Sequence, residues 1–210
     1  MHIVFLTIIF LVLISISSML IQIGVERWLV FFLMVLAYFA LLIGPSMWYT
    51  YKSNSLKAIG RFLKMYKNKP LYSYPYLLAH GNEAELKESL KRILTKYQQA
   101  SLQHTYGAIL AAMENDLPTM KEHAEKIGTE PLQSYYLAYH AILKRKFNQV
   151  DEWKNNINEP WMIHALDALV AKENGDMETM RKEADEAVRL TRGIQKYSLY
   201  YSFKRSDEWR

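Results

Sequence analysis

The fold of this chain is decided by residues 168 to 184, ALVAKENGDMETMRKEA, because their pattern recurs every thirty residues. Two alanines spaced three apart are followed by a turn and then by two apolar residues with the same spacing. The alanines are Ala108, Ala111, Ala138, Ala141, Ala168 and Ala171, and the apolar residues are Leu117, Met120, Phe147, Val150, Met177 and Met180. Such a period is typical of stacked helical hairpins, so we expect an all-α chain whose hairpins bury their apolar stripes against one another.

The repeat predicts about four helix pairs within residues 71 to 205, with Pro131 and Pro160 separating successive units. The apolar segment 194 to 203 is expected to be a capping helix, which a solenoid needs to cover its last hairpin. The alternative is that this aromatic segment is a docking or self-association surface. Residues 206 to 210 are expected to form a loose polar tail.

The spacing resembles the tetratricopeptide repeat, in which two antiparallel helices occupy about 34 residues. The positions that correspond to its small-residue site are Tyr74, Ala108, Ala138 and Ala168, at intervals of 34, 30 and 30 residues. The turn Gly175-Asp176-Met177 is similar to the Gly-Asp-aromatic turn of the family, and the resemblance covers about residues 67 to 192. Tyr74 is large for its site, Lys154 stands where the family has an aromatic residue, and two units are short. A generic helical bundle is the alternative.

Two long runs near the N-terminus contain no charged side chain, Ile3 to Ile23 and Trp28 to Tyr51. Each reaches the roughly 20 residues that a helix needs to cross a hydrocarbon core of about 30 Å. We therefore expect two transmembrane helices, at about residues 3 to 23 and 28 to 48, joined in a hairpin within residues 1 to 51. A cleavable secretory signal is the alternative for the first run.

Residues 52 to 70 are basic and contain no acidic side chain. The basic residues are Lys52, Lys57, Arg61, Lys64, Lys67 and Lys69. By the positive-inside rule this side is cytoplasmic, which predicts a two-span protein of the cell membrane with both termini in the cytoplasm. We expect these residues to contact anionic membrane lipid, at about 1 kcal/mol per basic residue. The segment is either an amphipathic helix lying on the membrane or a continuation of the second transmembrane helix that packs on the next hairpin.

The formal net charge of +5 is smaller than the charge of this basic segment, so the rest of the chain is close to neutral. A nucleic-acid partner is therefore not expected. The chain has no cysteine, no glycine-rich phosphate loop and no His-x-x-x-His pair, so we expect no catalytic, cofactor or metal site and no small-molecule substrate. His104 and His164 are expected to serve helix packing or to form a hydrogen bond to the backbone. A hydrolase or transferase with an unrecognised site is the alternative.

The resemblance implies an inner face formed mainly by the first helix of each pair. The candidate residues for a partner groove on this face are Leu102, Ile109, Tyr135, Tyr139, Ile142 and Leu169. They lack most of the Lys, Arg and Asn side chains with which clamp-type members of the family hold a peptide carboxylate. We therefore expect the groove to bind an apolar or aromatic protein segment, unless tight packing of the short repeats fills it.

These features predict a non-enzymatic, membrane-anchored cytoplasmic scaffold that recruits or regulates a protein partner. The alternative is a structural subunit of a membrane transport or secretion complex, in which the transmembrane hairpin makes the essential contacts.

Overall fold

The structure is a computed structural model that describes residues 2 to 208, and every regular element in that range is an α-helix. The predicted all-α class is therefore confirmed. The chain divides into two compact units, Met1–Thr50 and Tyr51–Arg210. We call the first the apolar unit and the second the repeat unit.

The apolar unit contains α1 (His2–Gln22) and α2 (Arg27–Tyr51), joined by a turn in which Gly24 has a φ of +93°. Its large side chains are exposed, as Trp28 (69%) and Phe31 (71%) illustrate. In the part of the chain that the structure describes, no unbroken helix has the length and hydropathy of a membrane span. The segments Arg27–Leu41 and Ile43–Tyr51 of α2 reach that length only together, across a bend of 40°. The two predicted spans stay a prediction.

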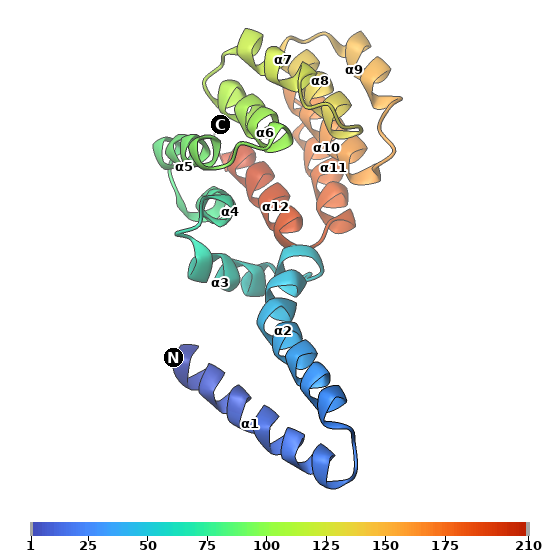
Figure 1. The fold of residues 1–210 in the computed structure, drawn as a ribbon. Helices are drawn as coiled ribbons and strands as arrows, with labels where there is room; N and C mark the ends of the chain where they lie inside the picture. The colour runs from blue at the N-terminus through green and yellow to red at the C-terminus, as the bar shows by residue number, and fades with distance from the viewer. Residues whose placement is uncertain (1, 209–210) are drawn as a thin grey trace. The chain divides into compact units, whose positions relative to one another are not determined.

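The repeat unit is built from consecutive helical hairpins (Figure 1). The hairpins are α4 (Pro70–His80) with α5 (Glu83–Lys96), α6 (Ala100–Met113) with α7 (Leu117–Glu125), α8 (Leu132–Leu143) with α9 (Phe147–Lys154), and α10 (Pro160–Glu173) with α11 (Met177–Leu190). They are preceded by α3 (Leu56–Tyr66) and followed by α12 (Gly193–Glu208). The basic segment thus belongs to the same compact unit as the hairpins.

The thirty-residue period is repeated in the backbone of the turns. The left-handed residues of the last three turns are Asn115 (φ 57°), Arg145 (φ 55°) and Gly175 (φ 79°). The N–H of the residue that follows donates in each case over 2.9 Å, from Asp116 to Ala111, from Lys146 to Ala141 and from Asp176 to Ala171. A left-handed residue followed by a hydrogen bond back to the preceding turn satisfies the last carbonyls of a helix. The same turn geometry thus ends the first helix of each of these three hairpins.

The repeated small residues explain the close packing within each hairpin. Ala108, Ala138 and Ala168 are all 0% exposed, and the apolar residues that face them, such as Met120 and Met180, are also buried. A small side chain at the crossing lets two helices approach closely. Where the pattern is broken at Lys154, the ammonium donates to Asp167 on α10 over 2.6 Å, so this departure is paired rather than left uncompensated.

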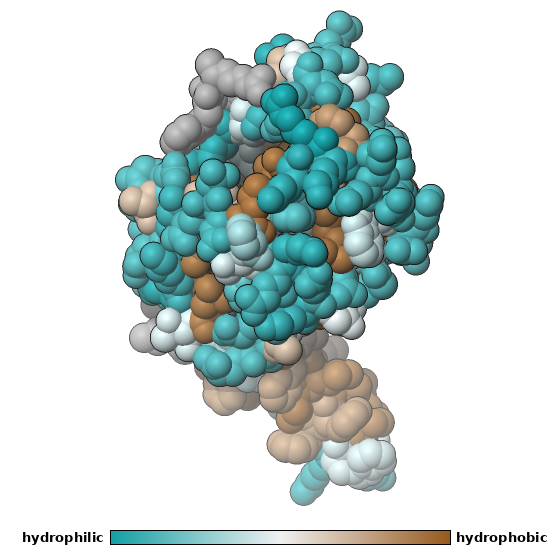
Figure 2. Space-filling model, turned by 90° about the horizontal axis from the view of Figure 1, so that it is seen from above, coloured by the Kyte–Doolittle hydropathy of each residue, from teal (hydrophilic) through white to brown (hydrophobic). Residues whose placement is uncertain are grey.

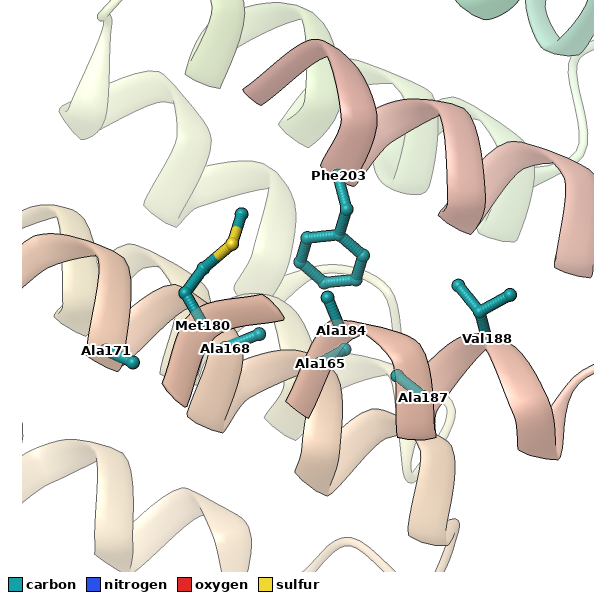
Figure 3. Packing of buried hydrophobic residues seen from close by; sticks show 8 residues of the cluster. All are labelled: Ala165, Ala168, Ala171, Met180, Ala184, Ala187, Val188 and Phe203. Carbon is teal, nitrogen blue, oxygen red and sulfur yellow. The ribbon is translucent and has the colours of Figure 1, made fainter. Parts of the chain in front are cut away.

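Helix α12 packs on α11 as a cap, but it also packs on α3 and α4 at the other end of the array (Figure 1). Its Phe203 lies over Ala165 and Ala184, between α10 and α11 (Figure 3). Its Arg205 donates through Nε to the carbonyl of Leu78 over 3.4 Å, and through its terminal nitrogen to the carbonyl of Gly81. The segment 194 to 203 is therefore a closing helix that joins the last hairpin to the first.

The helical structure extends beyond the expected start of the tail. Helix α12 continues through Glu208, and Lys172 donates to the hydroxyl of Ser206, which holds this last turn against α10. The remaining residues of the predicted tail, Trp209 and Arg210, lie outside the described residues.

Candidate functional site

The inner-face residues predicted from the sequence come from α6, α8 and α10, and the structure brings most of them together. Ile109, Tyr135 and Tyr139 pack against one core cluster between α6, α7 and α8. Tyr135 also contacts the cluster that contains Phe203, and Leu169 packs against the same cluster. Leu102, near the start of α6, is partly exposed.

Ile142 does not belong to the inner face. It is 1% exposed and packs with Val150 and Leu166 in the core between α8, α9 and α10. The reason is its position on the helix: it follows Ala141 and lies four residues after Ala138, so it shares the stripe that faces the second helices. We therefore remove Ile142 from the candidate groove.

Tyrosines that the sequence interpretation did not assign to the inner face complete it. The rings of Tyr74 on α4 and Tyr106 on α6 meet edge to face at 6.0 Å, and Tyr135 meets Tyr136 at 5.4 Å. We define the tyrosine cluster as Tyr74, Tyr106, Tyr135, Tyr136 and Tyr139. The sequence contained a signal for two of these tyrosines, because Tyr106 and Tyr136 are one repeat apart and so occupy equivalent positions.

Burial raises the pKa of each phenol in the tyrosine cluster, and neighbouring phenols raise it further for Tyr74 and Tyr135. Most of these side chains are nevertheless partly accessible to solvent. Raised pKa values together with partial accessibility describe half-buried phenols whose rings are only partly covered by their neighbours. In the view from above, apolar atoms show between polar side chains of the repeat unit (Figure 2).

The inner face is not a wide apolar groove. Beyond Tyr51, the large apolar side chains that are strongly exposed in the described part of the chain are Met65 and Leu190. Neither belongs to the first helices of the hairpins. The inner face is thus largely occupied by its own tyrosines and by α12, whose Tyr200 packs against the same core cluster as Tyr135 and Leu169.

A hollow of about 340 Å³ lies between the α4–α5 turn and α12, where Asn82, Lys204 and Arg205 contribute to its wall. The turn is already capped, because Asn82 accepts from the N–H of Glu85 and donates its own N–H to the Glu85 carboxylate. The Arg205 guanidinium is bound to backbone carbonyls. Asn82 and Arg205, which contribute to the wall of this hollow, therefore stabilise the fold.

All six predicted membrane-contact residues are exposed in the structure. Helix α3 carries Lys57, Arg61 and Lys64 on its outer side, while its apolar side packs against α4 and α12. Its first turn is capped by Ser55, whose hydroxyl accepts from the N–H of Ala58 over 3.3 Å. Of the expectations for residues 52 to 70, the packing on the next hairpin is present, but α3 does not continue α2, which ends at Tyr51, five residues before α3 begins at Leu56.

His104 and His164 occupy equivalent positions and bridge the two helices of their hairpins. Nδ1 of His104 lies 3.2 Å from Nδ1 of His123, and Nδ1 of His164 lies 2.7 Å from the Glu183 carboxylate. The polar partners of both rings are side chains, whereas a backbone partner was one of the two expectations. In the described part of the chain, no group of three His, Cys, Asp or Glu residues could hold a metal ion.

No protein-family model, curated protein or solved structure matches this chain. The resemblance to the tetratricopeptide repeat therefore rests on the spacing of its residues.

Proposed function

We propose that this protein is a membrane-anchored helical-repeat scaffold, of the tetratricopeptide type, that recruits or regulates a protein partner at the cytoplasmic face of the cell membrane. The observation that carries the proposal is the uneven distribution of apolar surface. Large apolar side chains are exposed throughout the described part of the apolar unit, whereas beyond Tyr51 the strongly exposed ones in the described range are Met65 and Leu190. Such a division suits a chain with one unit in lipid and one in water.

The chemistry of the apolar unit supports the lipid environment. The hydroxyls of Ser15 and Ser17 donate to carbonyls one turn earlier in α1, over 3.0 and 2.8 Å, and a polar group in hydrocarbon needs such an internal partner. The basic residues that follow α2, against the lone Arg27 between α1 and α2, support two spans with both termini in the cytoplasm.

A scaffold fits the inner face better than an enzyme does. A tyrosine that acts as a base or nucleophile needs a lowered pKa, but burial raises the pKa of Tyr135 and Tyr139. Neutral phenols with apolar rings are well suited to bind a protein surface, and tyrosine is enriched at interface hot spots. We assign partner contact to Tyr135, Tyr139 and Leu169, with an apolar or aromatic segment as the partner's contribution.

Site-specific photocrosslinking in intact cells tests the assignment. A photoreactive amino acid replaces Tyr139 in one variant and Lys121, an exposed residue on the outer helix α7, in a matched control. We expect a protein adduct from position 139 that is absent from position 121. Equal adducts at both positions, or none at 139 in correctly inserted protein, would show that the inner face is not the partner site.

The subunit of a transport or secretion complex is the second candidate, and the exposed apolar side chains of α2 favour it because they can contact another membrane protein as well as lipid. Replacing residues 1 to 47 with an unrelated transmembrane hairpin separates the two. The scaffold retains its crosslink at position 139 after the exchange. A complex subunit loses its contacts although it is still inserted.

A further inference from the structure

The face of α3 that points to solvent is basic. Between Lys52 and Asn82 the chain has no acidic residue. Lys52, Lys57, Arg61 and Lys64 are all exposed, and the ion pairs of the described residues are made by other cations. This face therefore carries positive charge that no carboxylate of the same segment neutralises.

The opposite face of α3 is no longer available. Ile59 and Leu63 are 0% exposed and Phe62 is also buried, because this side packs against α4 and α12. An amphipathic helix that enters a membrane interface needs its apolar side free. Of the apolar side chains on α3, Met65 is strongly exposed, and one methionine is not an inserting stripe.

We propose that this face binds anionic phospholipid headgroups by charge alone, without entering the bilayer. The proposal rests on the membrane anchor of the proposed function. Lys52 follows α2 directly, and three residues separate it from the start of α3 at Leu56. Three extended residues span only about 10 Å, which is comparable to the Debye length of about 8 Å at physiological salt. The chain itself therefore keeps the first turn of α3, with Lys57, within electrostatic reach of headgroups.

Helix α12 connects α3 to both ends of the array, so headgroup binding at α3 affects the position of both ends. The N–H of Gly193, the first residue of α12, donates to the carbonyl of Ser53 over 2.8 Å. Tyr197 of α12 lies against Gly60, where an added Cβ would approach the ring to 3.2 Å. Since α12 also contacts α4 and α11, a headgroup contact on α3 holds the whole closed array, and its inner face, in one orientation to the membrane.

Lysine reactivity in lipid nanodiscs tests the proposal with the full chain. The protein is placed in nanodiscs of phosphatidylcholine alone, or with about one third phosphatidylglycerol, and exposed briefly to an amine-acylating reagent. We expect Lys57 and Lys64 to react about threefold more slowly in the anionic discs, and about 0.5 M salt to remove the difference because it screens charge but not apolar burial. Lys121 on α7 is the internal control and should react equally in both.

The charge variant Lys57→Gln/Arg61→Gln/Lys64→Gln sharpens the result, with Lys121→Gln/Lys126→Gln as the matched control. Only the first should abolish the lipid dependence of labelling at Lys52. The inference is overturned if Lys57 and Lys64 react at equal rates in both lipids. If their slower reaction in anionic discs persists at high salt, α3 enters the bilayer and the inference of binding by charge alone is wrong. A soluble polyanion added to phosphatidylcholine discs is a further control. If it slows the acylation of Lys57 and Lys64 as much as the anionic lipid does, the inference is also overturned. Failure to enter either disc overturns the anchor itself.

Discussion

The Nδ1 atoms of His104 and His123 lie 3.2 Å apart, so the imidazoles of the α6–α7 hairpin meet nitrogen to nitrogen. One ring must donate and the other accept, which requires that at least one ring be neutral. Burial, followed by the charge of His104, lowers the pKa of His123. At the equivalent positions two repeats later, His164 meets a carboxylate, which accepts a hydrogen bond from a neutral or a protonated ring.

Acid should therefore loosen the α6–α7 hairpin. Because the folded state holds the pKa of His123 below its ordinary value of about 6.5, the unfolded chain binds the proton more readily. The stability contribution of His123 is present above about pH 6.5 and is lost as the pH falls through the lowered value. We expect a lower melting temperature at about pH 5.5 than at about pH 7.5 for the full chain in detergent, and a smaller difference for His123→Gln.

Other groups near the pair set the controls for this measurement. Glu122 on α7 raises the pKa of His123, and Lys126, just past the end of α7, lowers it. On α8, burial also lowers the pKa of His140. Lys91 on α5 is engaged with Glu114, just past the end of α6, at 3.6 Å. His140→Gln should remove a separate part of the acid sensitivity. If His123→Gln melts with the parent's full pH dependence, the pair is not the sensor.

Gly107→Ala should destabilise the protein although glycine is a poor helix residue. In an ordinary helix interior the change gains about 1 kcal/mol. Here an added Cβ would lie 2.5 Å from Cε1 of His123, so the ring must turn away from His104, and we expect a net loss of about 1 to 3 kcal/mol. Denaturant unfolding of Gly107→Ala, His123→Ala and the double variant measures the coupling. If alanine at 107 is equally harmful without the ring, this explanation is wrong.

The sequence predicted the hairpins because the contacts between neighbouring helices recur with the same period as Ala108, Ala138 and Ala168. It did not predict that α12 would pack against the first hairpin. Arg205 and Gly81, which the fold joins, are 124 residues apart, and no periodicity relates them. The same holds for the inner face. The spacing placed Tyr135 and Tyr139 there, but the burial of Ile142 depends on the rotation of α8 about its axis. The partial covering of this face by α12 depends on long-range packing, which no local pattern predicts.

The three equivalent turns predict opposite effects of glycine and alanine. A non-glycine residue in the left-handed region costs about 1 to 2 kcal/mol, so Arg145→Gly should stabilise by about 1 kcal/mol and Gly175→Ala should destabilise by a similar amount. Asn115→Gly should gain less, since asparagine tolerates this region. Arg145→Ala is the control, because it removes the exposed ion pair with Glu173 without relieving the backbone. Equal melting temperatures for the alanine and glycine variants at 145 would contradict the argument.

Closure by α12 should make the two ends of the array unfold together. Arg205→Gln leaves the carbonyls of Leu78 and Gly81 without the guanidinium, and losing a charged hydrogen bond costs about 1.5 to 3 kcal/mol. Hydrogen exchange should quicken in both α4 and α11 and change less in α9, which α12 does not touch among the main helix contacts. Lys182→Gln, at an exposed position of α11, should change neither. Faster exchange confined to α12 would mean that the ends are not coupled.

The tyrosine cluster makes the state of the inner face measurable by alkaline titration. Burial raises the pKa of Tyr74, Tyr135, Tyr136 and Tyr139 above the ordinary value, so the folded chain keeps these phenols neutral while the unfolded chain ionises them near pH 10. Stability is therefore retained below about pH 10 and lost as the pH rises further. Ultraviolet difference absorbance should show these phenols ionising together with the loss of helical circular dichroism. Phe203→Ala, which weakens the packing of α12 beside Tyr135, should move their ionisation to lower pH. Phenols that all ionise near pH 10 in a chain that is still helical would show that the inner face is open to water and that a partner could reach it without displacing α12.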